Sequence, residues 1–348
     1  MTFSGESLIT MYSDVMAFML VFGLVILSRR VTESTIEGRL FLSMCISMML
    51  DAIGNFFTYM FKYQNYVSYS SISILGKTIM ELAELFFIYQ WVLYSDYKIN
   101  GDEERLKTKF AIFFIPVIIF LFLLLLNPIS GVMFSPTDRL GYTYTKLYYV
   151  MQFIKVLYLI HTIFYIVYYR KKYGRLLFFS ANPLWIPLLI GVAVTLLSNY
   201  SAVALGAAIG INNLYFSMIA SWQYEDSATG FYNNEYLQRL VEIAGVKKLK
   251  YHSAILFTID EAEIAFAQIL RKSLKHENNI IHYGKGKYLV FLTNDTQTYI
   301  DTLVNSVVAA TDDYDLHNTI LPMRLRVSSW IKGNNQEAID FIRQVANK

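Results

Sequence analysis

The sequence of 348 residues is 55% hydrophobic and only 16% charged, whereas soluble domains carry about 25% charged residues. Together with a mean hydropathy of +0.38, this composition indicates a membrane protein and argues against a wholly soluble one. The formal net charge of +3 says little, because the placement of the basic residues matters more, and nucleic acid is not an expected partner. The single cysteine, Cys45, lies in an apolar run and excludes an intramolecular disulfide.

The charged residues divide the chain into two parts. Up to Ser221 the sequence is a series of long apolar runs, and beyond it charged residues recur every few positions. We therefore expect a transmembrane module at 1–221, a short junction at 222–225 and a cytoplasmic domain at 226–348. The first ten residues contain no basic segment and no small-residue cleavage site, so the first apolar run is expected to be a retained span rather than a secretory signal.

Seven apolar runs are long enough to cross a bilayer, which takes roughly 20 mainly apolar residues. They lie at about 8–28, 38–61, 71–95, 110–129, 145–169, 176–197 and 201–221. The last two are joined by a tight turn near Asn199. The sequence thus predicts an α-helical membrane bundle of seven spans.

Basic residues in the short loops indicate the orientation of these spans. Loops after the first, third and fifth spans carry eleven of them: Arg29, Arg30, Arg39, Lys98, Arg105, Lys107, Lys109, Arg170, Lys171, Lys172 and Arg175. Loops after the second, fourth and sixth spans carry only Lys62, Arg139 and Lys146. Because basic loops stay in the cytoplasm, we expect a multi-pass protein of the plasma membrane with its N-terminus outside and its C-terminal domain in the cytoplasm.

Several polar and ionisable side chains lie inside the predicted spans. They are Asp51 and Asn55 in the second span, Lys77, Glu81 and Glu84 in the third, and Lys155 and His161 in the fifth. Such groups are costly at membrane depth and usually face a bundle interior or a wet cavity, so they form a candidate ligand pocket or ion pathway. The alternative is structural: Lys77 pairs with Glu81 along one helix face, and the others, His161 included, form hydrogen bonds between helices.

Beyond Asp226 helix and strand patterns alternate. Helical spacing occurs at 233–248, 261–276, 296–310 and 336–347, and short β-rich runs occur at 253–259, 279–283, 287–292 and 323–331. The order predicts an α+β domain in which helices cover a largely antiparallel sheet. Asn233 or Asn234 is expected to cap the first of these helices.

Two phrases in this part resemble the GGDEF domain of bacterial diguanylate cyclases. DSATGFYNN keeps Asp226, Thr229, Gly230 and Asn233 of the family's D-x-L-T-G-L-x-N-R opening, which we interpret as a structural turn rather than a site. HYGKGKYLVFL matches the family's R-Y-G-G-D-E-F hairpin and the apolar strand after it, and RVSSWIKG loosely matches a later V-S-x-G strand. The resemblance covers 226–348 and implies a GGDEF-like, nucleotide cyclase-like sheet. The membrane part more loosely resembles seven-span input modules of bacterial sensor proteins.

The resemblance implies a chemistry as well as a fold. Members of the family condense two molecules of GTP to cyclic di-GMP between two domains of a dimer. Carboxylates of the hairpin turn and of the first core strand hold two divalent ions, which neutralise the charge that develops on the phosphoryl oxygens. The same resemblance implies a homodimer.

Most positions that carry this chemistry differ here. In the hairpin, Gly284 keeps the first glycine and Lys285 replaces the second, while Gly286 and Lys287 replace the two acids and Tyr288 replaces the phenylalanine. In the first core strand and the residues after it, Thr258 replaces the metal-binding aspartate and Asp260 remains at the second acidic position. Glu263 occupies the following lysine position. The segment between the strand and the hairpin is shorter than in the family. Lys275 and Asn278 stand in place of the R-x-x-D motif of an inhibitory product site.

These replacements predict a degenerate catalytic hairpin and a degenerate metal site. A lysine about 4 Å from a cation is repelled by roughly 4 kcal/mol at an effective dielectric constant of about 20, which Asp260 alone cannot offset. We expect no catalytic residue, no metal, no cofactor and no cyclase activity. The alternatives for the hairpin are an anion site made by backbone N–H groups and lysines, although P-loop spacing is absent, and a solvated tip in a protein-interaction domain.

Three functions are therefore weighed. The first is a bacterial membrane sensor whose inactive GGDEF-like domain relays signals through protein contacts, with the lipid bilayer, a second copy of the chain and a cytoplasmic signalling protein as partners. The second is a transporter or channel with a regulatory domain, favoured by the intramembrane charges. The third is an active diguanylate cyclase. Only Trp222, Gln223, Tyr224 and Glu225 join the last span to the domain, so the junction is expected to transmit movement directly.

Overall fold

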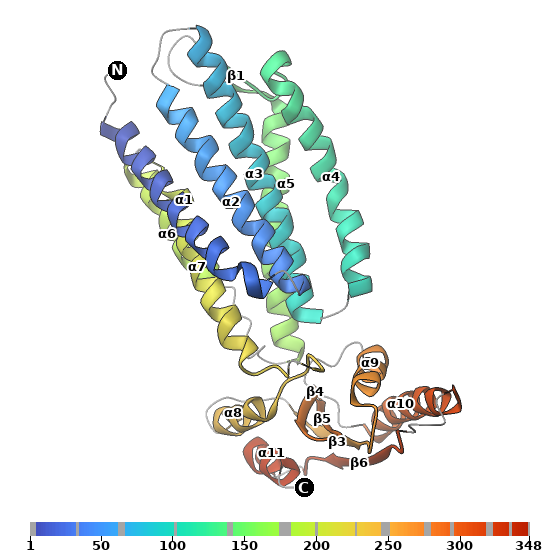
Figure 1. Ribbon diagram of the computed structural model, residues 1–348. Coiled ribbons are helices and arrows are strands. Elements are labelled where there is room, and N and C mark those ends of the chain that lie inside the picture. Colours follow the sequence, from blue (N-terminus) through green and yellow to red (C-terminus); the bar gives the residue numbers. More distant parts are fainter. Residues whose placement is uncertain are drawn as a thin grey trace. The chain divides into compact units, whose positions relative to one another are not determined.

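The computed structural model (Figure 1) describes residues 5–32, 35–61, 67–100, 103–137, 142–173, 182–198, 201–226, 228–244, 251–274, 280–292, 296–317, 323–333 and 336–346. The chain forms two compact units, Met1–Val167 with Phe179–Met218, here called the membrane unit, and Tyr168–Phe178 with Ile219–Lys348, here called the α/β unit. The expectations for Lys62, Arg139, Arg175, Asn199, Lys275 and Asn278 lie outside the described residues.

A helix overlaps each of the seven predicted spans. The helices are α1 (Gly5–Thr32), α2 (Ile36–Phe61), α3 (Val67–Asn100), α4 (Glu103–Ser130), α5 (Lys146–Tyr173), α6 (Asn182–Ser198) and α7 (Val203–Trp222). Five of them, α1, α2, α4, α5 and α7, are long and apolar enough to cross a membrane. The other two differ for separate reasons, because α3 carries charged residues in its middle and α6 has only 17 residues.

Helices α2 and α3 approach each other closely at two glycines. A Cβ atom added to Gly54 would lie 2.7 Å from the carbonyl oxygen of Gly76, and one added to Gly76 would lie 2.8 Å from that of Gly54. Small residues allow transmembrane backbones to come into such contact. The contact holds α2, which contains Asp51 and Asn55, beside α3 (Figure 1).

A short hairpin between α4 and α5 was not indicated by the sequence. Strands β1 (Phe134–Pro136) and β2 (Tyr142–Tyr144) pair antiparallel, with Phe134 opposite Tyr144. The Asn127 Oδ1 atom accepts hydrogen bonds from the backbone N–H groups of Met133, at 2.8 Å, and Phe134, at 3.0 Å. This side chain therefore fixes the start of the hairpin to the end of α4.

The α/β unit contains the predicted order of helices and strands. Its elements are α8 (Asn234–Ala244), β3 (Ser253–Thr258), α9 (Glu263–Ser273), β4 (Ile280–Gly284), β5 (Lys287–Leu292), α10 (Gln297–His317), β6 (Arg326–Ile331) and α11 (Ala338–Ala346). The strands form one sheet in the order β4-β5-β3-β6, and every neighbouring pair is antiparallel. This is the connectivity of a split β-α-β motif. An α+β unit with an antiparallel sheet is thus present.

Both faces of the two inner strands, β3 and β5, are covered, which explains why β3 is a continuous apolar run. On one face Ile255 and Phe257 pack with Phe266 of α9 and Ile300 of α10. On the other face the core is formed by residues of α8, α11, β3 and β5: Tyr236, Leu240, Ala254, Leu289, Phe291, Phe341 and Ile342. Because side chains alternate along a strand, a strand covered on both faces needs apolar residues at successive positions.

The junction between α7 and α8 is a hydrogen-bonded turn and not a continued helix. Helix α7 ends at Trp222, and the N–H groups of Tyr224 and Glu225 donate to the carbonyl oxygens of Ser221 and Trp222, each at 3.0 Å. The Asn233 backbone N–H donates to the Tyr224 carbonyl oxygen at 2.8 Å. Residues 222–225 are therefore folded against the start of α8.

Candidate functional site

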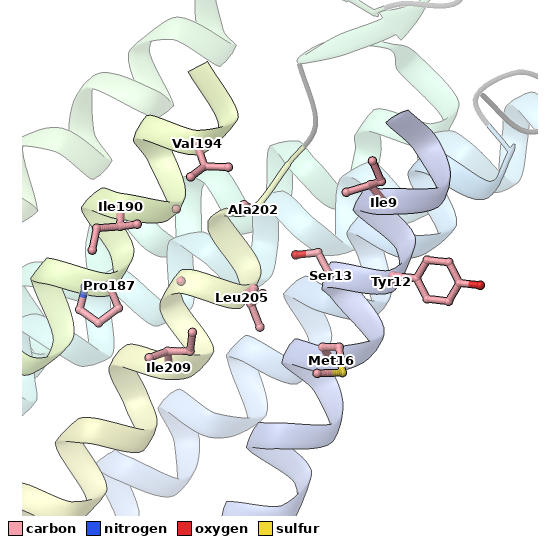
Figure 2. A pocket seen from close by; sticks show the side chains of 12 residues that line it. Ile9, Tyr12, Ser13, Met16, Pro187, Ile190, Val194, Ala202, Leu205 and Ile209 are labelled. Carbon is pink, nitrogen blue, oxygen red and sulfur yellow. The ribbon is translucent and has the colours of Figure 1, made fainter. Parts of the chain in front are cut away.

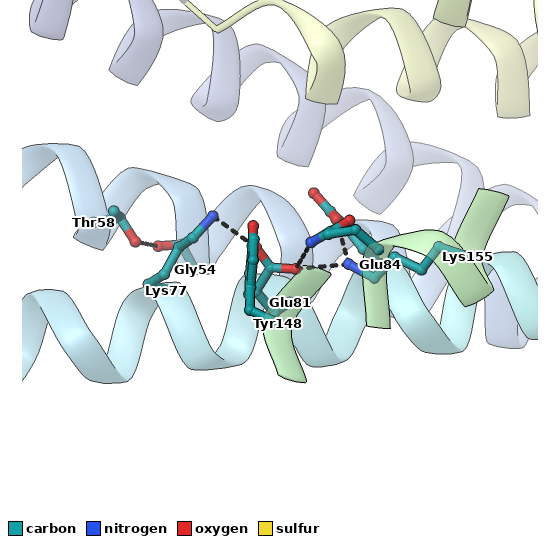
Figure 3. A network of polar contacts seen from close by, with 8 residues as sticks. Gly54, Thr58, Lys77, Glu81, Glu84, Tyr148 and Lys155 are labelled. Carbon is teal, nitrogen blue, oxygen red and sulfur yellow. Dashed lines mark hydrogen bonds and ion pairs between the residues drawn. The ribbon is translucent and has the colours of Figure 1, made fainter. Parts of the chain in front are cut away.

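Glu81 of α3 is the centre of a buried polar network in the membrane unit (Figure 3). Its side chain is 1% exposed and forms ion pairs with Lys77, at 2.7 Å, and with Lys155 of α5, at 2.6 Å. The Tyr148 hydroxyl and the Gln152 amide of α5 each donate a hydrogen bond to its carboxylate at 2.8 Å. Four donors thus surround one carboxylate, as a buried charge requires.

Lys155 connects this carboxylate to a second one. Its ammonium group lies 2.8 Å from Glu84 Oε2, and its side chain is 4% exposed, whereas that of Glu84 is 36% exposed. The positive charges of the two lysines equal the negative charges of the two glutamates in number. Of the sequence-predicted polar residues, Lys77, Glu81, Glu84 and Lys155 are therefore brought together, and the expected pairing of Lys77 with Glu81 is confirmed.

The remaining predicted pair, Asp51 and Asn55, lies on α2 and leads to a residue that sequence reasoning missed. The Asn55 amide donates a hydrogen bond to Asp14 Oδ1 of α1 at 2.9 Å. Asp14 is 1% exposed, and it is the only charged residue of the predicted span 8–28, which was the signal available in the sequence. Asp51 is 8% exposed, and Glu84, Asp14, Lys155 and Glu81 all act on it electrostatically.

A second set of charges, also missed, lies near the loops that carry most basic residues. Lys98 Nζ is 2.7 Å from Glu37 Oε1, which also accepts a hydrogen bond from the Tyr94 hydroxyl at 3.0 Å. Arg105 Nε is 3.4 Å from Asp96 Oδ2. Sequence reasoning counted Lys98 and Arg105 only as loop charges, whereas they also join helices.

An apolar cavity of about 570 Å³ lies among α1, α6 and α7 (Figure 2). Ile190 and Val194 of α6 and Leu205 and Ile209 of α7 line it, and the few polar atoms come from residues such as Ser13. The hydroxyl groups of Tyr12 and Ser13 are the polar side-chain groups of this lining, which contains no carboxylate, amine, imidazole or thiol. The charged network, which lies elsewhere in this unit, is the better candidate for a functional site.

In the α/β unit Thr258, expected from the resemblance to stand at a degenerate metal site, has basic residues on both sides. Thr258 of β3 lies opposite Lys287 of β5 on one side and opposite Arg326 of β6 on the other. Asp260 forms an ion pair with Arg326 at 2.7 Å. Across the described residues, no group of three or more His, Cys, Asp or Glu side chains could hold a metal ion.

The hairpin turn between β4 and β5 has a structure of its own. Gly286 has a φ of +66°, and its carbonyl oxygen accepts a hydrogen bond from the Ile259 N–H at 2.8 Å. Its own N–H donates to Glu263 Oε1 at 2.9 Å. A Cβ atom at Gly286 would collide with the Ile259 carbonyl oxygen, whereas one at Gly284 would meet only the Lys287 side chain at 3.9 Å. Glycine at 286 is therefore a structural requirement.

The lysines and the tyrosine of this hairpin have separate surroundings. Lys287 Nζ lies 5.7 Å from the centre of the Tyr283 ring, and Lys285 is exposed. Tyr288 is fully buried, and its hydroxyl donates to the Glu263 carbonyl oxygen at 3.0 Å. Burial, together with the nearby Glu263 and Asp226 carboxylates, raises the pKa of Tyr288 above its usual range. The Tyr288 ring is therefore part of the hydrophobic core of the α/β unit.

The turn at residues 226–233, here called the Asp226 turn, is built by the residues that carry the family resemblance. Asp226 Oδ1 accepts hydrogen bonds from the backbone N–H and the hydroxyl of Thr229, each at 2.8 Å. Gly230 has a φ of +67°, which glycine adopts without strain. Asn233 Oδ1 accepts from the Tyr236 N–H at 3.1 Å and so caps α8, as predicted.

His282 of β4, which sequence reasoning did not single out, lies beside this turn. Its Nδ1 is 3.5 Å from Asp226 Oδ1, its Nε2 is 3.6 Å from Glu263 Oε2, and its ring stacks on Tyr288. Burial opposes ionisation of Asp226, but the hydrogen bonds from Thr229 and the nearby His282 outweigh it and hold the pKa of Asp226 below its ordinary value. The Asp226 turn is thus held by contacts of the Asp226 carboxylate with Thr229 and His282.

The five long apolar helices indicate a membrane protein, and the chain also contains an α/β unit. Comparison with models of known protein families finds no match to this chain, and comparison with curated proteins finds none either.

Proposed function

We propose that this chain is an integral membrane signalling protein, in which a seven-span sensor unit controls a cytoplasmic, catalytically inactive GGDEF-like domain that acts through protein contacts. In this proposal α3 and α6 cross the membrane with the other five helices. The charges in the middle of α3 are paired with one another and with α5, which lowers the cost of placing them in a bilayer. Seventeen residues of α6 extend about 26 Å at 1.5 Å per residue, close to the thickness of the hydrocarbon core.

The proposed orientation, with the N-terminus outside, rests on the excess of basic residues in the loops after the first, third and fifth spans. Cysteine labelling of intact cells tests it, with Thr137→Cys in the loop between α4 and α5 and Asp312→Cys on α10. The first should react from outside and the second only after permeabilisation. The wild-type protein, whose single Cys45 is buried, gives the background. The reverse labelling pattern would show that the orientation is wrong.

The observation that carries the inactive-domain proposal is the charge around Thr258. Lys287 and Arg326 lie on its two sides, and Arg326 holds the Asp260 carboxylate. A magnesium site relies on one or two carboxylates together with the phosphates of the substrate. Here cationic side chains occupy the neighbouring positions, and Gly286, where the family has an acid, is required by the backbone.

The activity test uses the purified full-length protein with GTP and magnesium. We expect no cyclic di-GMP above the level of a matched blank. Product that forms in the wild-type protein and disappears in the Asp260→Ala variant would refute the proposal. The oligomeric state is tested separately, since light scattering in detergent should give the mass of two chains if the family's dimer is retained.

A transporter or channel is the second candidate, favoured by one observation. Ionisable groups from α1, α2, α3 and α5 lie within the membrane unit, and such groups mark ion pathways as well as structural sites. Reconstitution into liposomes separates the two functions. Ion or substrate flux that depends on the intact protein and is reduced by Glu81→Gln would support transport, whereas sealed vesicles without flux support the sensor.

A further inference from the structure

Among the described residues of the membrane unit, two aspartates each have a buried carboxylate oxygen without a hydrogen-bond partner and also form no ion pair. They are Asp14 Oδ2 on α1 and Asp51 Oδ1 on α2, and both atoms are buried, with no partner among the described residues. The residues themselves are 1% and 8% exposed. Buried carboxylate oxygens in folded proteins almost always have a donor. Two buried carboxylate oxygens without a donor inside a helix bundle therefore need an explanation.

The nearby lysine side chains already form ion pairs with other carboxylates. Lys77 and Lys155 are paired with Glu81 and Glu84, at 2.6 to 2.8 Å. Among the described residues no basic group lies within ion-pair distance of Asp14 or Asp51. An isolated carboxylate removed from water is disfavoured by several kcal/mol, and such a group usually takes up a proton instead.

We propose that Asp14 and Asp51 form a proton-binding site inside the membrane unit, in which at least one carboxyl group is protonated near neutral pH. The proton comes from hydronium, an O–H bond forms at Asp14 Oδ2 or Asp51 Oδ1, and water is released. This inference goes beyond the proposed function, because it holds for a sensor and for a transporter alike.

The surroundings favour a proton over a metal cation. The Asn55 amide nitrogen points its N–H donor at Asp14 Oδ1, and a donor at that position repels a cation. Metal cations such as sodium and calcium need several oxygen ligands, as the six to eight around calcium illustrate. No cluster of three or more His, Cys, Asp or Glu side chains suited to a metal lies in the described part of the chain. A proton needs only one oxygen.

Loss of the proton would change the balance of the neighbouring network. The charged groups that act on Asp51 are Glu84 and Glu81 of α3, Asp14 of α1 and Lys155 of α5. An ionised Asp51 would compete with Glu84 for Lys155, whose pairing with the partly exposed Glu84 is the weaker of its two. Release of the proton is thus coupled to the position of α5 relative to α3.

Infrared spectroscopy of the full chain in lipid nanodiscs tests the site directly, because a protonated carboxyl group has a C=O stretching band that a carboxylate lacks. We expect the wild-type protein to show this band near neutral pH and to lose it as the pH is raised. The double variant Asp14→Asn/Asp51→Asn should lose the band near neutral pH completely. Its thermal stability should be nearly unchanged, since an amide is close in shape and charge to the neutral acid.

Asp96→Asn is the matched control. Asp96 is also a buried aspartate, 4% exposed, and its Oδ2 atom also has no hydrogen-bond partner, but this atom lies 3.4 Å from Arg105 Nε in an ion pair, so this variant should keep the whole band. If the wild-type protein shows no such band near neutral pH, this result alone overturns the proposal. A band that survives in the double variant would overturn it too. A band that sodium ions abolish at constant pH would assign the site to a metal cation instead.

Discussion

Lys155 of α5 and Glu81 of α3 form an ion pair with 2.6 Å between Nζ and Oε2, although 74 positions separate them in the sequence. Both side chains are almost fully buried. Two ion pairs join α3 to α5 in the described part of the chain, and both side chains are buried only in this one, because Glu84, the other partner of Lys155, is 36% exposed. It is therefore the contact on which the arrangement of these two helices depends most.

The first prediction compares the two glutamates of this network. Glu81→Gln leaves Lys77 and Lys155 without their common carboxylate, and breaking a buried pair in this way costs about 3–5 kcal/mol. Glu84→Gln removes one contact from a partly exposed position, which costs up to about 1 kcal/mol. Thermal unfolding of the purified protein in detergent should show a much larger decrease in Tm for Glu81→Gln. Equal decreases would contradict the geometry.

The same network separates what the sequence could predict from what it could not. The pairing of Lys77 with Glu81 follows from their spacing of four residues on one helix. The partner of Lys155 depends on how α5 packs on α3, and no local pattern contains that information. Asp14 was missed because one acidic residue in an apolar run has no spacing to interpret, and its role depends on the position of Asn55.

In the α/β unit the order of elements was predictable because helical and strand periodicities differ, and so was the cap at Asn233. The role of Gly286 could not be predicted from the sequence. In the sequence it is one of two alternating glycines, and only the approach of the Ile259 carbonyl oxygen distinguishes it from Gly284. The position of His282 between two carboxylates likewise depends on the pairing of distant segments.

The second prediction uses these two glycines as a matched pair. Gly286→Ala forces a side chain into a left-handed conformation and against the Ile259 carbonyl oxygen, so we expect a loss of about 3 kcal/mol or more. A Cβ atom at position 284 would meet only the Lys287 side chain at ordinary contact distance. Gly284→Ala should therefore change the free energy of unfolding by less than about 1 kcal/mol. Hydrogen exchange of β4 and β5 in the full-length protein measures both. A Gly286→Ala variant with wild-type protection would show that the turn is not built as described.

The third prediction concerns acid stability through Asp226. Its pKa is held below the ordinary value, so the carboxylate stabilises the folded state above its unfolded pKa, and that contribution is lost as the pH falls through the folded pKa. Thr229→Ala removes the hydroxyl donor and should cost about 1.5–3 kcal/mol near neutral pH. It should also move the loss of stability to higher pH.

Thr229→Ser is the control for this prediction, because serine keeps both the hydroxyl and the backbone donor. The measurement is Tm of the full-length protein as a function of pH from neutral to acidic. The serine variant should follow the wild-type curve. If the alanine and serine variants behave alike, the hydroxyl of Thr229 does not control the ionisation of Asp226.

The last prediction tests the junction that joins the end of α7 to α8. Asn233 caps α8 through its side-chain oxygen, and its side-chain nitrogen donates to the Gln223 carbonyl oxygen at 2.8 Å. Because one side chain holds both the helix and the turn, Asn233→Ala should cost about 1–2 kcal/mol and should increase amide exchange at residues 223–225. Asn234→Ala alters an adjacent, exposed asparagine and should leave exchange there unchanged. Exchange that rises equally in both variants would mean that Asn233 does not fix the junction, and direct transmission of movement from α7 would then lack its structural basis.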